Sequence, residues 1–403
     1  MAMPDFCSSL SSYQAYIESE IGKQQLPAAD PEAIKISFNL ALTIIQRIQR
    51  QGAISFADFM QMALYEPGLG YYASGNQKFG AQGDFVTAPE ISPLFAQTIT
   101  QQFTQVFNQL EPNILELGAG SGVFAAEALL ELERLKVLPE QYSILEVSAE
   151  LQARQKTTIE QKAPHLISKV RWLERLPKEF NGVVFVNEVV DAIPVELYRF
   201  KNQQIEQAYV DYSNQGFEWH WQKSDKNNID KPLINNQIIE DRTWANAWLD
   251  SLMASCNKAL FILIDYGYSE DELYHFARKR GTLQHYYRHH KTDNPLALVG
   301  MQDITSSVDF TQLALTADRQ KAQLLGYSTQ ASFLLGTGIE KIAQRRMEQT
   351  AASDTMQAMK VGHELKQLLM PDEMGETCKV LAFGKNFQQD LMGFALDNQL
   401  HKL

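Results

Sequence analysis

The sequence contains little cysteine and no long hydrophobic run. Its three cysteines, Cys7, Cys256 and Cys378, lie far apart and form no Cys-x-x-Cys pair. This spacing excludes a zinc module of the usual kind and favours a reducing compartment. No apolar stretch approaches the ~18 residues of a transmembrane helix. We therefore expect neither a metal site nor a membrane span.

Positive charge is also scarce. The chain has 36 Lys and Arg residues against 48 Asp and Glu residues, which gives a formal net charge of −12. Proteins that bind nucleic acid use clustered Lys and Arg to contact phosphates, so we expect no nucleic-acid partner. The first twenty residues contain no Lys or Arg, unlike a secretory signal or an Arg-rich presequence, and this favours a cytoplasmic location.

The most informative stretch is 112–122, Pro-Asn-Ile-Leu-Glu-Leu-Gly-Ala-Gly-Ser-Gly. A short apolar run ends at Gly118, Gly120 and Gly122, and an apolar pattern with helical spacing follows. A strand, a glycine turn and a helix in this order begin a doubly wound α/β sheet, in which a nucleotide-like ligand lies across the carboxyl end of the strand. Glycine allows close approach of the backbone and takes positive φ at little cost.

Two alignments of these glycines compete. Gly118-x-Gly120-x-Gly122, with Glu116 just before it, suits S-adenosylmethionine (AdoMet), whereas Gly120-x-Gly122-x-x-Ala125 can be fitted to the dinucleotide fingerprint. The next predicted strand, 142–147, contains Glu146 near its end, where its carboxylate would accept hydrogen bonds from ribose hydroxyls in either case. The motif alone therefore leaves an AdoMet-dependent enzyme and an NAD-linked oxidoreductase open.

The remaining patterns predict an α/β fold with a Rossmann-like sheet, an N-terminal helical region and an inserted β-meander with a helix. Ser55 is expected to be the N-cap of a helix. We expect four segments: residues 1–95 with helices and an active-site loop, 96–195 with the first half of the core, 196–258 with the insertion, and 259–403 with the second half. Further strands are predicted at 170–173, 183–186, 260–264 and 378–383, helices at 93–110, 149–162, 240–257, 311–325 and 339–370, and loops at 65–95 and 281–310.

Polar residues follow several predicted strands. Besides Glu146, they are Asn187 with Glu188, Asp191, and Asp265. The carboxyl ends of neighbouring parallel strands meet at one crevice, so these groups should converge there. A functional role is favoured for Glu188, whereas Asp265 is as consistent with a helix N-cap as with function, and Asp191 is expected to cap a following helix.

Several stretches, taken in order, resemble the MidA family of AdoMet-dependent methyltransferases, which includes the mitochondrial complex I assembly factor. The similarity covers about residues 54–384. It rests on Phe56-Ala-Asp-Phe-Met60, Gly70-Tyr-Tyr72, Gly83-Asp-Phe85, Thr87-Ala-Pro-Glu90, Glu116-Leu-Gly-Ala-Gly-Ser-Gly122, Asn187-Glu-Val-Val-Asp191-Ala-Ile-Pro194, Gly281-Thr-Leu283, Asp303-Ile-Thr305 and Val308-Asp-Phe310.

The resemblance implies a seven-stranded methyltransferase core and AdoMet as cofactor, and the absence of a presequence suggests a bacterial member. It implies protein arginine methylation, which in the mitochondrial members acts on a complex I subunit. The implied catalytic residues are Asp84, Asn187 and Glu188. The implied cofactor-binding residues are Gly83, Phe85, Thr87, Pro89, Glu116, Gly118, Ala119, Gly120, Gly122 and Glu146.

The chemistry agrees with an arginine acceptor. A guanidinium is protonated at neutral pH, and carboxylates that bind it in a bidentate manner fix its orientation. We expect Glu188 to be the principal group that orients the acceptor, with Asn187 and Asp84 beside it. His289 and His290 are expected to be surface or loop-stabilising residues rather than a general base. A small-molecule methyltransferase and a non-catalytic AdoMet-binding assembly factor remain alternatives, and the sequence leaves open whether the chain forms a homo-oligomer.

Overall fold

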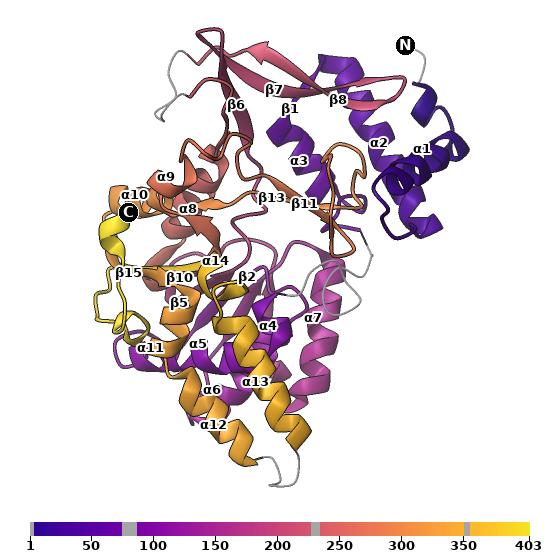
Figure 1. The fold of residues 1–403 in the computed structure, drawn as a ribbon. Helices are drawn as coiled ribbons and strands as arrows, with labels where there is room; N and C mark the ends of the chain where they lie inside the picture. Colours follow the sequence, from indigo (N-terminus) through magenta and orange to yellow (C-terminus); the bar gives the residue numbers. More distant parts are fainter. Residues whose placement is uncertain (1–3, 75–86, 227–233, 350–354) are drawn as a thin grey trace. The chain divides into compact units, whose positions relative to one another are not determined.

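The computed structural model describes residues 4–74, 87–226, 234–349 and 355–403 (Figure 1). The chain forms two compact units, each made of three chain segments. The first unit contains Met1–Phe85, Ala192–Ala245 and Asp271–Ser307. The second unit contains Val86–Asp191, Asn246–Glu270 and Val308–Leu403.

The second unit is built on a sheet with the strand order β15-β16-β10-β5-β2-β3-β4. The strands β10, β5, β2, β3 and β4 are parallel, and β16 pairs antiparallel with β10 and β15. This is the predicted Rossmann-like arrangement of seven strands, to which β14 adds at the end of β10. The bounds are β2 (Ile114–Leu117), β3 (Tyr142–Leu145), β4 (Val170–Leu173), β5 (Phe180–Asn187), β10 (Cys256–Tyr268), β14 (Val308–Asp309), β15 (Gln323–Thr329) and β16 (Cys378–Lys385).

The order of the strands reverses between β2 and β5. From β2 the chain continues to β3 and β4 on one side, whereas β5 and β10 lie on the other side. In a doubly wound sheet this reversal opens a crevice outside the carboxyl ends of the strands. The glycine turn follows β2, so it lies at this point.

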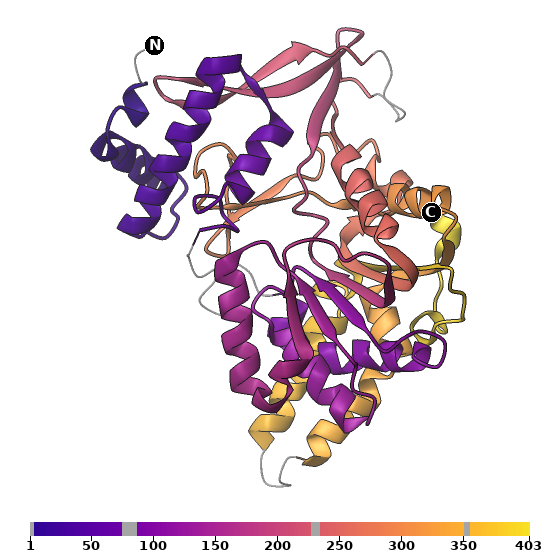
Figure 2. The same ribbon diagram turned by 180° about the vertical axis from the view of Figure 1, so that it is seen from behind.

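Helices cover both faces of the sheet (Figures 1 and 2). Alternate side chains of a strand point to opposite faces. Leu260 and Ile262 of β10 belong to the apolar cluster that includes α5 (Pro93–Val106), α6 (Val123–Arg134) and α11 (Gln330–Gly336). On the other face Phe261 stacks on Phe383, with ring centroids 4.8 Å apart. Burial on both faces explains why these strands are continuous apolar runs rather than alternating ones.

Two helix predictions for the second unit are wrong. The helix predicted over 339–370 is two helices, α12 (Ile339–Gln349) and α13 (Thr355–Leu369), which pack against each other. The helix predicted over 311–325 is α10 (Phe310–Arg319), because Lys321 adopts a φ of 60°, which a right-handed helix excludes. The chain then enters β15, a strand that the sequence analysis missed.

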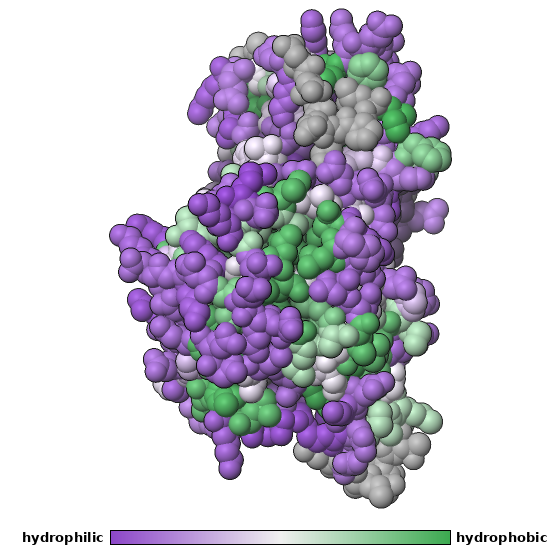
Figure 3. All heavy atoms as spheres, turned by 90° about the vertical axis from the view of Figure 1, so that its left-hand side faces the viewer, coloured by the Kyte–Doolittle hydropathy of each residue, from purple (hydrophilic) through white to green (hydrophobic). Residues whose placement is uncertain are grey.

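One face of the molecule exposes apolar side chains among polar ones (Figure 3). Exposed apolar residues of the second unit include Leu315 of α10, which is 46% exposed, and Leu396, which is 67% exposed. No helix in the part of the chain that the structure describes is long and apolar enough to cross a membrane.

The remaining helices are α4 (Ala88–Ile91), α7 (Ala149–Lys162), α8 (Thr243–Ala254), α9 (Glu270–Leu273), α14 (Met374–Thr377), η2 (Pro164–Lys169), η3 (Met392–Phe394) and η4 (Leu400–Lys402).

The first unit combines the N-terminal helices with the predicted β-meander. The N-cap prediction for Ser55 is confirmed, since its hydroxyl accepts the N–H of Asp58 at 3.2 Å. Phe59 packs edge-on against Phe217, with ring centroids 5.8 Å apart, which joins the helices to the sheet. The bounds are η1 (Asp5–Cys7), α1 (Leu10–Lys23), α2 (Pro31–Gln51), α3 (Phe56–Tyr65), β1 (Ile54–Ser55), β6 (Glu196–Lys201), β7 (Gln204–Ser213), β8 (Gly216–Lys223) and β9 (Ile238–Asp241).

The loop predicted over 281–310 contains a small antiparallel sheet instead, β12-β11-β13. Its strands are β11 (Gln284–Tyr287), β12 (His290–Lys291) and β13 (Asp303–Thr305). Strands this short carry too few residues to show an alternating pattern, so sequence periodicity did not detect them. In the same unit, the hydroxyl of Tyr72 donates to the carboxylate of Asp303 at 2.9 Å.

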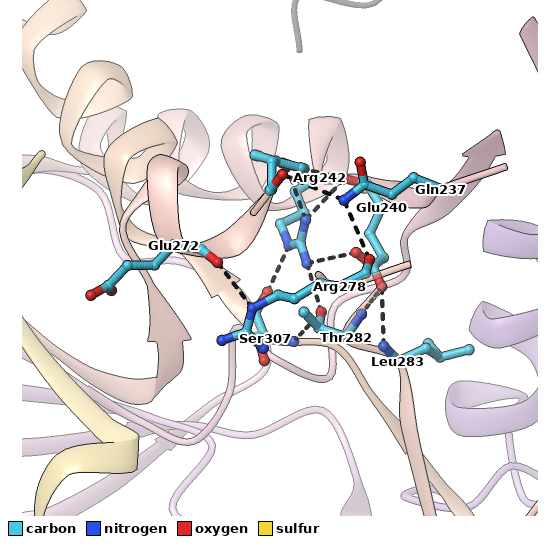
Figure 4. Close-up of polar contacts among 9 residues, drawn as sticks. Gln237, Glu240, Arg242, Glu272, Arg278, Thr282, Leu283 and Ser307 are labelled. Carbon is cyan, nitrogen blue, oxygen red and sulfur yellow. Dashed lines mark hydrogen bonds and ion pairs between the residues drawn. The ribbon is translucent and has the colours of Figure 1, made fainter. Parts of the chain in front are cut away.

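A buried ion pair holds the Gly-Thr-Leu stretch 281–283 (Figure 4). Glu240 and Arg242 are 3% and 7% exposed, and their closest charged atoms are 3.4 Å apart. The Glu240 carboxylate accepts two backbone N–H groups of the stretch, and Arg242 donates to the Thr282 hydroxyl at 3.1 Å. Buried charges need such partners. A Cβ on Gly281 would lie only 2.3 Å from Glu240 Oε1, so this contact requires glycine.

Candidate active site

The glycine turn begins directly after β2. Gly118, Gly120 and Gly122 have φ values of 64°, 53° and 84°, all in the left-handed region that favours glycine. A Cβ on Gly118 would lie 2.7 Å from a methyl carbon of Val189. A Cβ on Gly122 would lie 2.9 Å from the Cα of Gln155 on α7. The turn therefore needs glycine both for its backbone conformation and for its packing.

Replacing Gly122 by alanine should lower the free energy of unfolding by about 2–4 kcal/mol, because left-handed strain adds to a clash with the α7 backbone. The matched control is Gly338→Ala. Gly338 has a φ of 88° but nothing within 4 Å of its Cβ position, so it tests the strain alone. Chemical denaturation of both variants measures the difference. Equal losses in the two variants would show that the contact with α7 is unimportant.

Glu116 lies within β2 and is 3% exposed. Its carboxylate accepts a hydrogen bond from the Tyr142 hydroxyl of β3 at 2.7 Å. Burial raises the pKa of Glu116 to about 8, and the bond from Tyr142 opposes this rise. Glu116 thus joins β2 to β3 just before the glycine turn. Ala119 lies in the turn itself, and its carbonyl accepts the N–H of Gly122 at 2.7 Å.

Glu146 directly follows β3 and is held from two sides. One carboxylate oxygen accepts the N–H of Ser148 at 2.9 Å, and the other accepts the side-chain amide of Gln155 at 3.1 Å. The same amide donates to the carbonyl of Gly120 at 3.2 Å. Glu146 and the glycine turn are therefore joined through Gln155, a residue that the sequence analysis did not single out.

Asn187 ends β5, and Glu188 follows it with a φ of 51°. Non-glycine residues in this conformation often occur at functional sites. One carboxylate oxygen of Glu188 accepts the Asn187 amide at 3.0 Å and the N–H of Ala88 at 3.2 Å. Burial raises the pKa of Glu188 to about 7, and the nearby carboxylate of Asp265 adds to this rise. The buried oxygen of the Asn187 side chain has no hydrogen-bond partner among the described residues.

Asp265 holds the segment that carries Glu188. One of its carboxylate oxygens accepts the backbone N–H groups of Val189, Val190 and Asp191 at 3.2, 2.8 and 3.3 Å. The other accepts the N–H of Tyr266 at 2.8 Å. The prediction that Asp191 caps a following helix is wrong, because the chain passes through a turn into β6. The residue that caps this turn is Asp265, from a neighbouring strand.

The short helix α4 connects both parts of the site. The N–H of Ala88 donates to Glu188, and the Glu90 carboxylate accepts the hydroxyl of Ser121 in the glycine turn. Thr87 and Pro89 lie in the same segment, with Thr87 as the N-cap residue of α4. The other predicted residues of this loop, Gly83, Asp84 and Phe85, lie outside the described residues.

The two candidate histidines lie in the first unit, where the chain turns from β11 to β12. Arg288 and His289 have φ values of 47° and 64°, and His289 and His290 are exposed. The ring of His290 contacts the carbonyl of Arg288 at 2.6 Å. Both histidines are thus surface groups of a hairpin, in agreement with the sequence analysis. No group of three or more metal-binding side chains that could hold an ion occurs within residues 4–74, 87–226, 234–349 and 355–403.

A family model and several known proteins are similar to this chain in sequence. A family model described as a putative S-adenosyl-L-methionine-dependent methyltransferase matches residues 94–328. A mitochondrial protein arginine methyltransferase homolog of Caenorhabditis elegans is 26% identical over 343 residues, which cover 76% of this chain and 78% of that protein. The corresponding Mus musculus enzyme is 25% identical over 375 residues, which cover 83% and 81%.

A solved structure is also similar. The crystal structure of a Burkholderia thailandensis protein bound to S-adenosyl-homocysteine has 35% sequence identity and a TM-score of 0.88. The alignment covers 94% of this chain and all of that one. The likeness therefore extends through both units rather than the methyltransferase core alone.

Proposed function

Because the chain belongs to the MidA family of AdoMet-dependent methyltransferases, we propose that it methylates a protein on an arginine side chain. The side-chain oxygen of Asn187, which has no partner among the residues that the structure describes and lies beside the Glu188 carboxylate, is the observation that supports this proposal most directly. A buried acceptor without a partner is costly unless a ligand donates to it. A guanidinium offers several N–H donors in one plane and carries the charge that a carboxylate binds.

The residues around the glycine turn fit AdoMet. The turn follows β2 at its carboxyl end, where a nucleotide-like ligand lies in doubly wound sheets, and its glycines have the positive φ that shapes such a turn. Glu146 is fixed at the end of the neighbouring strand β3, where the ribose hydroxyls of a nucleotide bind in doubly wound sheets. We propose that Gly118, Ala119, Gly120 and Gly122 bind the cofactor together with Glu146, and that Glu116 supports the turn from β2.

When bound, AdoMet supplies an electrophilic methyl group on a sulfonium. Glu188 and Asn187 would orient the acceptor nitrogen toward it, and this alignment is the main contribution that such an enzyme makes. Asp265 keeps the backbone of Val189–Asp191 in place and so fixes the position of Glu188. Because Glu188 has a pKa of about 7, it is also placed to accept the proton that the methylated nitrogen releases.

Transfer of labelled methyl groups into a lysate of the source organism tests the proposal. We expect label in a protein, and specifically on arginine after hydrolysis to amino acids. A subunit of respiratory complex I type is the first candidate, since the family resemblance implies it. Label confined to a metabolite would establish a small-molecule methyltransferase instead. AdoMet binding without any transfer would favour a non-catalytic assembly factor.

A further inference from the structure

Gln155 is a buried amide in the middle of α7, with 0% exposure. Its nitrogen lies 3.2 Å from the carbonyl oxygen of Gly120 and 3.1 Å from a carboxylate oxygen of Glu146. Its oxygen lies 3.0 Å from the indole nitrogen of Trp172 on β4. One side chain thus contacts the glycine turn and the strand ends of both β3 and β4.

The chemistry of these partners fixes the orientation of the amide. The indole N–H of Trp172 is only a donor, so it must meet the amide oxygen. The two hydrogens of the amide nitrogen then point at the two acceptors, the Gly120 carbonyl and the Glu146 carboxylate. A flipped amide would lose all three hydrogen bonds, so a single orientation is stable.

We propose that Gln155 is a positioning residue that sets the distance between the glycine turn and Glu146, and so shapes the site for the nucleoside end of AdoMet. This inference rests on the proposed placement of AdoMet at the turn. The backbone of Gln155 takes part as well, because its Cα lies 2.9 Å from the Cβ position of Gly122. The turn is therefore held against α7 by packing and by a hydrogen bond at the same residue.

The amide also determines how Glu146 binds its ligand. Its N–H donates to one oxygen of Glu146, while Ser148 donates to the other. Together the two donors fix the plane of the carboxylate. A carboxylate held in this orientation presents acceptor oxygens of the kind that bind ribose hydroxyl groups. No carboxylate at position 155 could serve in this way when ionised, since it would repel Glu146.

The test is the affinity for AdoMet of Gln155→Glu, measured by calorimetry from about pH 6 to about pH 8. At the higher pH we expect an affinity at least ~10-fold lower than that of the wild type, because two adjacent carboxylates would both be ionised. At the lower pH the two carboxyl groups, at positions 146 and 155, would share a proton. We then expect the affinity of the variant for AdoMet to come within ~3-fold of that of the wild type. A merely structural defect would not recover in this way.

Three further variants complete the test. Gln155→Leu should bind AdoMet weakly across the same pH range. Trp172→Phe removes the donor to the amide oxygen together with one ring of a partly buried side chain, and it leaves both acceptors of the amide nitrogen in place, so it should weaken AdoMet binding less. Gln161→Glu makes the same charge change at an exposed position of α7 and should leave binding unchanged.

The surrounding charges are the same in all these variants. On α7 the nearest ionisable side chains in the sequence are those of Glu150, Arg154 and Lys156, and the adjacent strands carry Glu116, Tyr142 and Arg171. Glu90 of α4 contacts the glycine turn through Ser121. Gln155 makes hydrogen bonds to none of them; its own bonds are with Gly120, Glu146 and Trp172. The AdoMet affinity of the wild type is measured over the same pH range, and the affinity of each variant is expressed as a ratio to it. The contribution of these groups then cancels.

Two outcomes separate the inference from the proposal beneath it. If Glu146→Gln weakens AdoMet binding but neither Gln155 variant nor Trp172→Phe does, the role of Gln155 is overturned. If Glu146→Gln and Gly122→Ala also bind AdoMet as the wild type does, the cofactor lies elsewhere and the proposed placement fails.

Discussion

Replacing Glu188 by glutamine should reduce methyl transfer about 100-fold, because the acceptor nitrogen would lose the carboxylate that aligns it. The affinity for AdoMet should stay within about twofold of the wild type, since Glu188 contacts Asn187 and α4 rather than the glycine turn. Turnover of the labelled acceptor and calorimetric titration with AdoMet measure the two quantities. A variant that retains full transfer would refute the assignment of Glu188.

The same substitution should stabilise the protein at alkaline pH. The folded-state pKa of Glu188 is about 7, above its ordinary value of 4.5. A carboxyl with a raised pKa contributes stability below the ordinary value, and that contribution is lost as the pH rises through the folded-state value. Near pH 8 the ionised group therefore destabilises the wild type, and Glu188→Gln should recover roughly 1–3 kcal/mol. Denaturation at two pH values measures this gain.

Glu116→Gln provides the matched control for this gain. Glu116 lies in the second unit as well, and its burial raises its pKa to about 8. It should show a similar stabilisation at alkaline pH. A stability gain in both variants, with a defect in acceptor turnover at saturating AdoMet in Glu188→Gln alone, would separate the destabilising effect of a carboxylate with a raised pKa from its function. Glu188 would then be an example of a group kept for activity at a cost in stability.

The sheet of the second unit could be predicted from the sequence because its strands are buried on both faces. The run Val183–Val186 is apolar throughout, and its residues are 0% exposed. The helix of residues 149–162 was also predicted, with the bounds that the structure shows. The short strands of the β11–β13 sheet have no such signal. They pair with one another within residues 284–305, but each is too short to show an alternating pattern.

The polar residues of the site likewise divide into those with a local signal in the sequence and those without one. Glu146 and Glu188 follow strands directly, so the rule that strand ends meet at one crevice identified them. Gln155 lies in the middle of a helix, and its importance depends on Gly120, Glu146 and Trp172 being close in space. The spacing of four residues from Leu151 to Gln155 and from Gln155 to Ile159 is the signal that could have placed Gln155 on the inward face of α7. The sequence alone does not show which groups that face meets.

Asp265 was left open between function and a helix cap, and the structure gives it a third role, the capping of a turn from another strand. Asp265→Ala should lower the free energy of unfolding by roughly 3–5 kcal/mol, because three N–H groups of Val189–Asp191, two of them in buried hydrogen bonds, would lose their acceptor. Methyl transfer should fall with it, since these residues follow Glu188 directly. Chemical denaturation and acceptor turnover measure both losses.

Asp265→Asn distinguishes the loss of an acceptor from the loss of charge. In the wild type, the N–H of Tyr266 donates to the second carboxylate oxygen of Asp265. In the variant, the amide oxygen can still accept from the three N–H groups, but the amide nitrogen would face the N–H of Tyr266, and two donors would meet. We expect a smaller loss of roughly 1–2 kcal/mol. Asparagine also removes the negative charge that raises the pKa of Glu188, so that pKa should fall. If the alanine variant were as stable as the wild type, the segment beside Glu188 would owe its position to packing, and Asp265 would have no part in holding it.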